Sequence, residues 1–113
     1  MAAGLLNILI EQGATWARTI TIYATAEDKL DLTGKTLRGQ LRRHLSDATP
    51  AASFTFAPKD QNTNTGEVVV SLTATQTAAL AQQTYRYDFE LVDDDTVVRI
   101  LEGDAKVSGE ATK

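Results

Sequence analysis

Few side chains in this sequence have the types that metal or proton chemistry requires. His44 is the one histidine, so a pair of imidazoles for a metal site or a proton relay is missing. The run Asp93-Asp94-Asp95 could attract Ca²⁺, but it lacks the spacing of an EF-hand loop, and calcium needs oxygens converging from several positions. We interpret His44 as a solvated strand residue and the acidic run as a solvated hairpin turn, with cation binding at the turn as the alternative.

The basic cluster of the chain consists of Arg38, Arg42 and Arg43, and the first two fall on one face of a predicted strand. Nucleic-acid or phosphate binding would need more positive charge than a domain of net charge −4 supplies. These arginines therefore indicate a strand face that is salt-bridged or that contacts another protein.

Motifs for catalysis are missing as well. The sequence has no Gly-rich phosphate loop, no nucleophile elbow and no HExxH motif. Cysteine is absent, so disulfides and thiolate metal sites are excluded, as expected of a protein made in a reducing cytoplasm. We predict that the protein is not an enzyme and expect no cofactor, metal or small-molecule substrate.

Length and composition indicate one globular domain. A chain of 113 residues can bury roughly two-thirds of its unfolded surface, and 42% hydrophobic with 23% charged residues is typical of a globular protein. No apolar run approaches the ~20 residues of a membrane helix, and Met1–Ile10 lacks the basic region of a signal peptide. We predict a single domain over residues 1–113, with its core at about 8–108, a short N-terminal arm and a C-terminal tail.

The strongest structural signal is the stretch Leu72–Glu102. Four large residues alternate with charged ones in a pattern typical of a half-buried strand: Tyr85, Tyr87, Phe89 and Leu91. The acidic turn then leads into a second strand-like run, Thr96–Glu102, which predicts a hairpin. One of the tyrosines is expected to bond backbone as in a tyrosine corner.

Shorter alternating runs before the hairpin predict further strands, and Thr73–Gln76 forms a capping box that predicts one short helix. Two residues interrupt the alternation. Gly39 indicates a bend or the close approach of an aromatic ring, while Arg18 requires a bulge or a place at a sheet margin. A bulge or kink is expected at Gly103. About seven or eight short strands indicate an all-β sandwich.

The first strand-like segment is unusually apolar. All residues from Leu5 to Ile10 except Asn7 are leucine or isoleucine, so both faces of this strand would be apolar. Such a strand at a sheet edge is an aggregation hazard unless it is covered. We predict that Leu5, Leu6 and Ile8 contact a partner, oriented by Arg38, Arg42 and Arg43; burial of the segment as a central strand of its own domain is the alternative.

Six stretches together resemble a family of tailed-bacteriophage proteins. They are QGATWARTITIY (Gln12–Tyr23), LDLTG (Leu30–Gly34), LRGQLRR (Leu37–Arg43), VSLTATQTAAL (Val70–Leu80), YRYDFELV (Tyr85–Val92) and VVRILEGDAKVS (Val97–Ser108). The pattern is similar to the N-terminal domain of phage baseplate upper proteins and related short virion proteins, over roughly Ile8 to Ser108. It departs from them at Ala81–Thr84, where the family has a Pro/Gly turn.

The resemblance implies an immunoglobulin-like antiparallel β-sandwich that serves as a structural or docking module of the virion. Its partners would be other virion proteins and copies of itself, with no nucleic acid and no membrane involved. A tail or baseplate adaptor, present in multiple copies, is the leading expectation, and a capsid decoration protein is the alternative. A carbohydrate- or receptor-binding sandwich would need exposed aromatics beside polar loops, whereas most aromatics here fall on inward phases.

Overall fold

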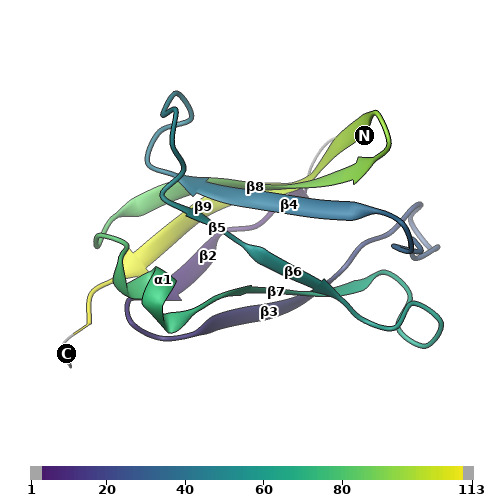
Figure 1. Ribbon diagram of the computed structural model, residues 1–113, viewed down its shortest axis with the longest axis horizontal. Coiled ribbons are helices and arrows are strands. Elements are labelled where there is room, and N and C mark those ends of the chain that lie inside the picture. Colours follow the sequence, from purple (N-terminus) through teal and green to yellow (C-terminus); the bar gives the residue numbers. More distant parts are fainter. Residues whose placement is uncertain (1–3, 111–113) are drawn as a thin grey trace.

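The computed structural model describes residues 4–110, and its strands form two sheets packed against each other (Figure 1). The larger sheet contains β1 (Gly4–Leu5), β2 (Ile8–Glu11), β4 (Thr36–Arg42), β5 (Ala52–Ser53), β8 (Thr84–Asp93) and β9 (Thr96–Ser108). The smaller sheet contains β3 (Trp16–Thr21), β6 (Thr55–Pro58) and β7 (Glu67–Leu72), and the helix α1 spans Ala74–Ala78. The predicted all-β sandwich with one short helix is confirmed.

The long hairpin β8–β9 forms the middle of the larger sheet. The predicted inward face of β8 is confirmed, because the four alternating side chains are buried: Tyr85, Tyr87, Phe89 and Leu91. Asp94 turns the hairpin with a positive φ of 50°, a conformation that aspartate tolerates. The register of β9 shifts between Phe89 and Glu90, so the bulge lies opposite these residues and not at Gly103, where it was expected.

The order of the strands follows the immunoglobulin arrangement. The series β9-β8-β4 and β3-β7-β6 correspond to strands G-F-C and B-E-D of that sandwich. The other strand pairs are antiparallel, whereas β1 and β2 run parallel to β9. The direction follows from the connection at residues 12–15, by which β2 passes the chain across to β3 in the other sheet (Figure 1).

Two strand runs are interrupted. The extended segment after β4 pairs with β4 through β5, crosses the sandwich at Phe54, and pairs with β7 through β6. The N–H of Phe54 still donates to the carbonyl of Gly39 at 2.9 Å, which holds the crossing in place. The first strand is also divided, into β1 and β2, but both parts pair with β9 in the larger sheet. Within residues 4–110, the nine labelled strands therefore form seven continuous runs, as the sequence predicted.

The capping box and the tyrosine corner are both confirmed. Thr73 caps α1 by accepting from the Gln76 N–H, and the Gln76 side chain accepts from the Thr73 N–H. The hydroxyl of Tyr85 bonds both the N–H and the carbonyl of Ala81, at 3.0 and 3.3 Å. On the buried side of α1, Thr77 donates to the carbonyl of Ala14 at 2.9 Å, so the helix fixes the connection from β2 to β3.

Aromatic rings fill the space between the sheets. Phe89 lies edge-on to Phe54 and Phe56, with ring centroids 4.9 and 5.1 Å apart. A Cβ on Gly39 would lie 2.6 Å from the Phe89 ring, which confirms the predicted close approach. Arg18 needs no bulge, because β3 is an edge strand and the exposed guanidinium lies 5.9 Å from the centre of the Trp16 ring.

Candidate docking surface

Charged side chains cover the solvent side of the larger sheet, which we call the outer face. Residues paired on neighbouring strands point to the same side of a sheet, so β4, β8 and β9 contribute rows of outward side chains. We define the outer face by Arg38, Gln40, Arg42, Arg86, Asp88, Glu90, Arg99, Glu102 and Asp104, together with the outward Leu5 and Leu9 of β1 and β2.

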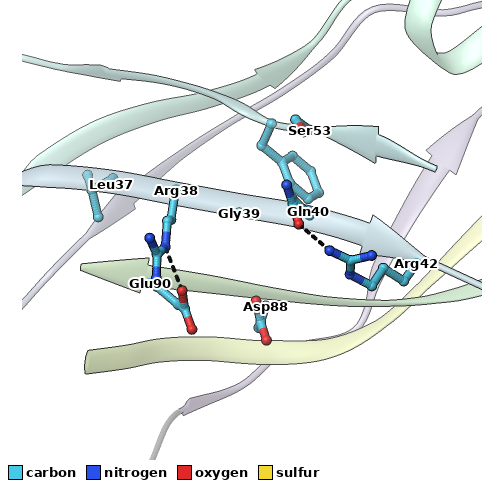
Figure 2. Close-up of a pocket in the computed structure, with 9 residues that line it drawn as sticks. Leu37, Arg38, Gly39, Gln40, Arg42, Ser53, Asp88 and Glu90 are labelled. Carbon is cyan, nitrogen blue, oxygen red and sulfur yellow. Dashed lines mark hydrogen bonds and ion pairs between the residues drawn. The ribbon is translucent and has the colours of Figure 1, made fainter. Parts of the chain in front are cut away.

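The charges of the outer face are paired across strands. Arg38 Nε lies 2.7 Å from Glu90 Oε1, which joins β4 to β8 (Figure 2). Arg99 on β9 lies 3.4 Å from Asp88 and 3.9 Å from Glu102. Arg86 pairs with Asp104 in the same way. Exposed pairs of this kind add little to stability.

Asp88 lies at the centre of this pattern. Burial beneath its neighbours raises the pKa of the Asp88 carboxyl above the ordinary 3.8; Arg99 acts in the opposite direction, while Glu90 and Glu102 raise the pKa further. The carboxyl therefore holds its proton to higher pH than a solvated aspartate. A proton on Asp88 would weaken its ion pair with Arg99 and change the charge of the outer face.

The three predicted arginines have different surroundings. Arg38 is ion-paired, whereas Arg42 donates to the carbonyl of Asp47 at 2.6 Å and to the Gln40 side chain at 2.8 Å. Arg42 thus fixes the loop after β4. Arg43 lies beyond the end of β4 and is exposed.

The N-terminal residues divide between the core and the surface. Leu5 is 75% exposed, and Leu6 is partly buried against the core. Ile8 is only 5% exposed and packs inside the sandwich, so the expectation that it contacts a partner was wrong. Its side chain points inward because β2 pairs with β9 and presents alternate residues to the core. Of the predicted arm, Met1 to Ala3 lie outside the described residues.

The structure brings Leu5, Arg38 and Arg42 onto one face but not into contact, whereas Arg43 lies beyond the end of β4. Leu5 pairs with Glu102, Glu102 with Asp88, and Asp88 with Gln40, so this row crosses the sheet from β1 to β4. Three strand spacings separate its ends by about 14 Å. The predicted apolar and basic contacts therefore occupy opposite margins of the outer face, with the paired charges between them.

A cleft of about 490 Å³ opens beside the free margin of β4. It exists because β5 pairs only with Gln40 and Leu41 before the chain leaves for the other sheet. Figure 2 shows the side chains at this margin, with Arg38 turned toward Glu90 and Arg42 toward Gln40. Charged groups that are already paired line the cleft, with Phe54 at its inner side.

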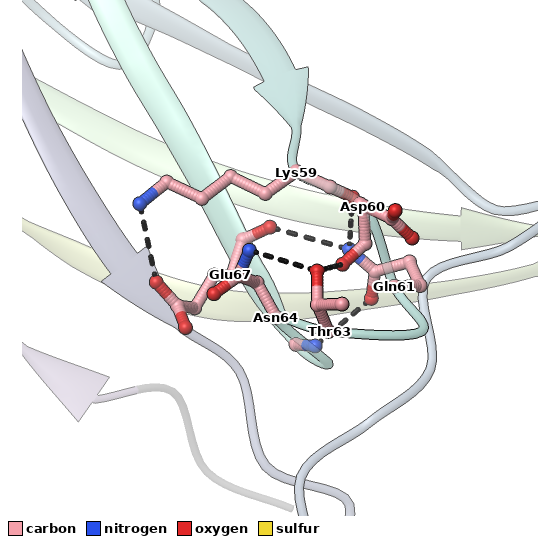
Figure 3. Close-up of polar contacts among 7 residues, drawn as sticks. Lys59, Asp60, Gln61, Thr63, Asn64 and Glu67 are labelled. Atoms are coloured by element: carbon pink, nitrogen blue, oxygen red, sulfur yellow. Dashed lines mark hydrogen bonds and ion pairs between the residues drawn. The ribbon is translucent and has the colours of Figure 1, made fainter.

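The polar loop at residues 59–66, which the sequence marks as the most loop-like stretch, is held by its own side chains (Figure 3). The side-chain oxygen Oε1 of Gln61 accepts from the N–H of Leu32 at 3.0 Å and from that of Gly66 at 2.9 Å. Lys59 and Glu67 pair at 3.3 Å where the loop meets the smaller sheet. This loop therefore supports the fold and is separate from the outer face.

Groups for metal chemistry are not gathered in one place. Among residues 4–110, no three side chains of His, Cys, Asp or Glu are placed to hold a metal ion. Asp93 pairs with Lys35 at 3.7 Å. His44 is solvated as expected, but it lies in the loop after β4 and not in a strand, because β4 ends at Arg42.

No helix described in residues 4–110 reaches the length and apolarity of a membrane span.

Of the outer face, sequence reasoning named only Leu5, Arg38 and Arg42 as contact residues, and it missed the exposed Leu9 and the pairing of the charges. Leu9 is 52% exposed at the sheet margin. Because alternate residues of a strand share a face, the sequence places Leu9 on the same side as Leu5 and Asn7, and this could have identified it. The pairing of Arg99 with Asp88 and Glu102 could not be predicted from the sequence, since it requires the register of β8 against β9.

No protein-family model matches the chain, and no curated protein matches it. Among solved structures, it is similar to InlP of Listeria monocytogenes, with 15% sequence identity and a TM-score of 0.44. The similar region covers 95% of this chain and 26% of InlP, so the chain spans about a quarter of the length of that protein.

Proposed function

We propose that this chain is a non-enzymatic structural protein of a tailed bacteriophage, a docking module of the tail or baseplate that is present in several copies in the virion. The observation that carries the proposal is the outer face, a broad sheet surface of paired charges that ends in two exposed leucines, Leu5 and Leu9. The resemblance of the strand and turn motifs to baseplate upper proteins supports the assignment to a virion.

The chemistry of the outer face suits protein recognition. Its charges are of both signs in a fixed arrangement, so a partner with the complementary arrangement would be selected, and a wrong register would bring like charges together. Leu5 and Leu9 would contribute apolar burial of about 1.5–3 kcal/mol for each side chain that is fully covered.

Mass spectrometry of purified particles tests the proposal. Particles of the phage that encodes this chain are separated on a density gradient, and the chain is quantified against the major capsid protein. We expect it in intact particles and in the isolated tail fraction. Recovery with tail-free heads would instead identify a capsid decoration protein, and absence from all particles would overturn the virion assignment.

A charge reversal tests the role of the outer face. Arg99→Glu should reduce incorporation into particles, because it places a third acid beside Asp88 and Glu102. Lys59→Glu is the matched control, since it also breaks an exposed ion pair but lies on the other sheet. Equal incorporation of both variants would contradict docking through the outer face.

A further inference from the structure

The margin of the larger sheet formed by β1 and β2 differs from the other margins of the sandwich. In the described part of the chain, β3 carries Arg18, β4 carries Arg38, and β6 ends in Pro58. Charged residues and proline on edge strands are the usual protection against unwanted strand pairing. From Gly4 to Ile10 there is neither, the first charge being Glu11 at the end of β2, and the outward side chains of Leu5 and Leu9 are 75% and 52% exposed.

Within residues 4–110, backbone groups of β1 and β2 also point toward this margin. The N–H of Leu6 donates to Glu102 at 2.9 Å, and the N–H of Gln12 donates to Ser108 at 3.0 Å, so even-numbered residues bond β9. Successive residues of a strand direct their N–H and C=O groups to opposite sides. The backbone groups of Leu5 and Leu9 therefore point away from β9, toward the open edge.

We propose that two copies of this chain pair through this margin, with β1 and β2 of one copy antiparallel to β1 and β2 of the other. The two larger sheets then form one continuous sheet. The proposal depends on the several copies in the proposed function and names the contact between two of them. An isologous contact of this kind closes on itself and yields a dimer.

Charge selects the register of the pair. Leu5 lies beside Glu102, and Leu9 lies beside Lys106 on β9. If Leu5 of one copy faces Leu9 of the other, each leucine pair is bordered by a glutamate on one side and a lysine on the other. If Leu9 of one copy faced Leu9 of the other, the Lys106 side chains of both copies would border the contact. We therefore assign the register in which Leu5 pairs with Leu9 and Asn7 lies at the twofold axis.

Sedimentation of the purified full chain tests the dimer. At about 100 µM, a contact with a Kd of ~10 µM would leave most of the protein dimeric. Leu9→Glu should weaken association about tenfold or more, while Leu45→Glu, at a leucine 72% exposed in the loop after β4, should leave it unchanged. Leu9→Pro should act like Leu9→Glu and keep the fold, because it removes an N–H that β9 does not use.

Cross-linking tests the register, since the chain has no cysteine of its own. Facing residues of antiparallel strands have Cα atoms about 4.5–5.5 Å apart, within the range for a disulfide. Mixed Leu5→Cys and Leu9→Cys chains should form a disulfide on oxidation, and neither variant should cross-link alone. A wild-type monomer at this concentration, higher oligomers, or a Leu9→Cys homodimer would overturn the proposal. If the purified chain were a monomer but were still present in particles, the dimer proposal would fail and the virion assignment would stand.

Discussion

The hydroxyl of Tyr87 on β8 donates a hydrogen bond to the backbone carbonyl of Leu6, at the point where β1 ends and before β2 begins. Between them lies Gly103 of β9, which pairs with Tyr87. A Cβ on Gly103 would lie 2.0 Å from the Leu6 oxygen. A glycine and a buried tyrosine together thus fix the N-terminal strand to the hairpin.

Tyr87→Phe should lower the free energy of unfolding by about 1–3 kcal/mol, because the Leu6 carbonyl loses a partner in a partly buried place. Burial raises the pKa of Tyr87 to about 12, with Arg18 opposing, above the ordinary value of 10.0. Hydroxyl protonation therefore stabilises the fold below pH 10, and this contribution is lost as pH rises toward 12. Chemical denaturation from pH 8 upward should show less alkaline loss in Tyr87→Phe than in the wild type.

Gly103→Ala should displace β1 from the sheet, because its methyl group meets the backbone of Leu6 and cannot be accommodated by a side-chain rotation. We expect a loss of about 1–3 kcal/mol. Amide hydrogen exchange should show faster exchange in β1 and β2. Gly34→Ala offers a comparison with no neighbouring atom within 4 Å, although its φ of +76° adds strain of its own. Unchanged protection of β2 in Gly103→Ala would contradict the packing described here.

Phe89→Ala should cost about 3–5 kcal/mol, because the ring is 1% exposed and contacts both Phe54 and Phe56. Equilibrium denaturation measures the loss. A cost below about 1 kcal/mol would mean that the ring is not part of the core. Thr55→Ala, at an exposed position between the two other rings, serves as the control and should be nearly neutral.

Asp88→Asn should change the pH dependence of stability. Because burial raises the Asp88 pKa, the folded state holds a proton that the unfolded state has released, so stability falls as pH rises from 3.8 through the folded pKa. The variant lacks this loss. Its melting temperature relative to the wild type should therefore increase with pH over this interval and then level off. A difference that does not change with pH would contradict the raised pKa.

Deletion of Met1–Asn7 should destabilise the domain, because it removes β1 and the Leu6 carbonyl that Tyr87 bonds. Thermal unfolding measures the effect. A truncated protein with the melting temperature of the full chain would show instead that this segment is an arm independent of the core.

The alternation of apolar and polar residues was sufficient to identify the strands whose two faces differ in polarity. Tyr85 to Leu91 could be assigned to the core because charged residues separate the large ones, and the same pattern identified Gly39 as a place of close approach. Thr73 and Gln76 predicted the helix start because a capping box is a local interaction. These features depend on neighbours in the chain, so the sequence contains them.

The N-terminal segment could not be resolved in this way, because leucine and isoleucine occupy both of its faces. Only pairing with β9 decides that Ile8 points into the core and Leu9 to the surface. The parallel direction, the crossing at Phe54 and the ion pairs of Arg99 likewise depend on which strands become neighbours. Strand pairing joins residues far apart in the chain, and a local pattern does not specify such contacts.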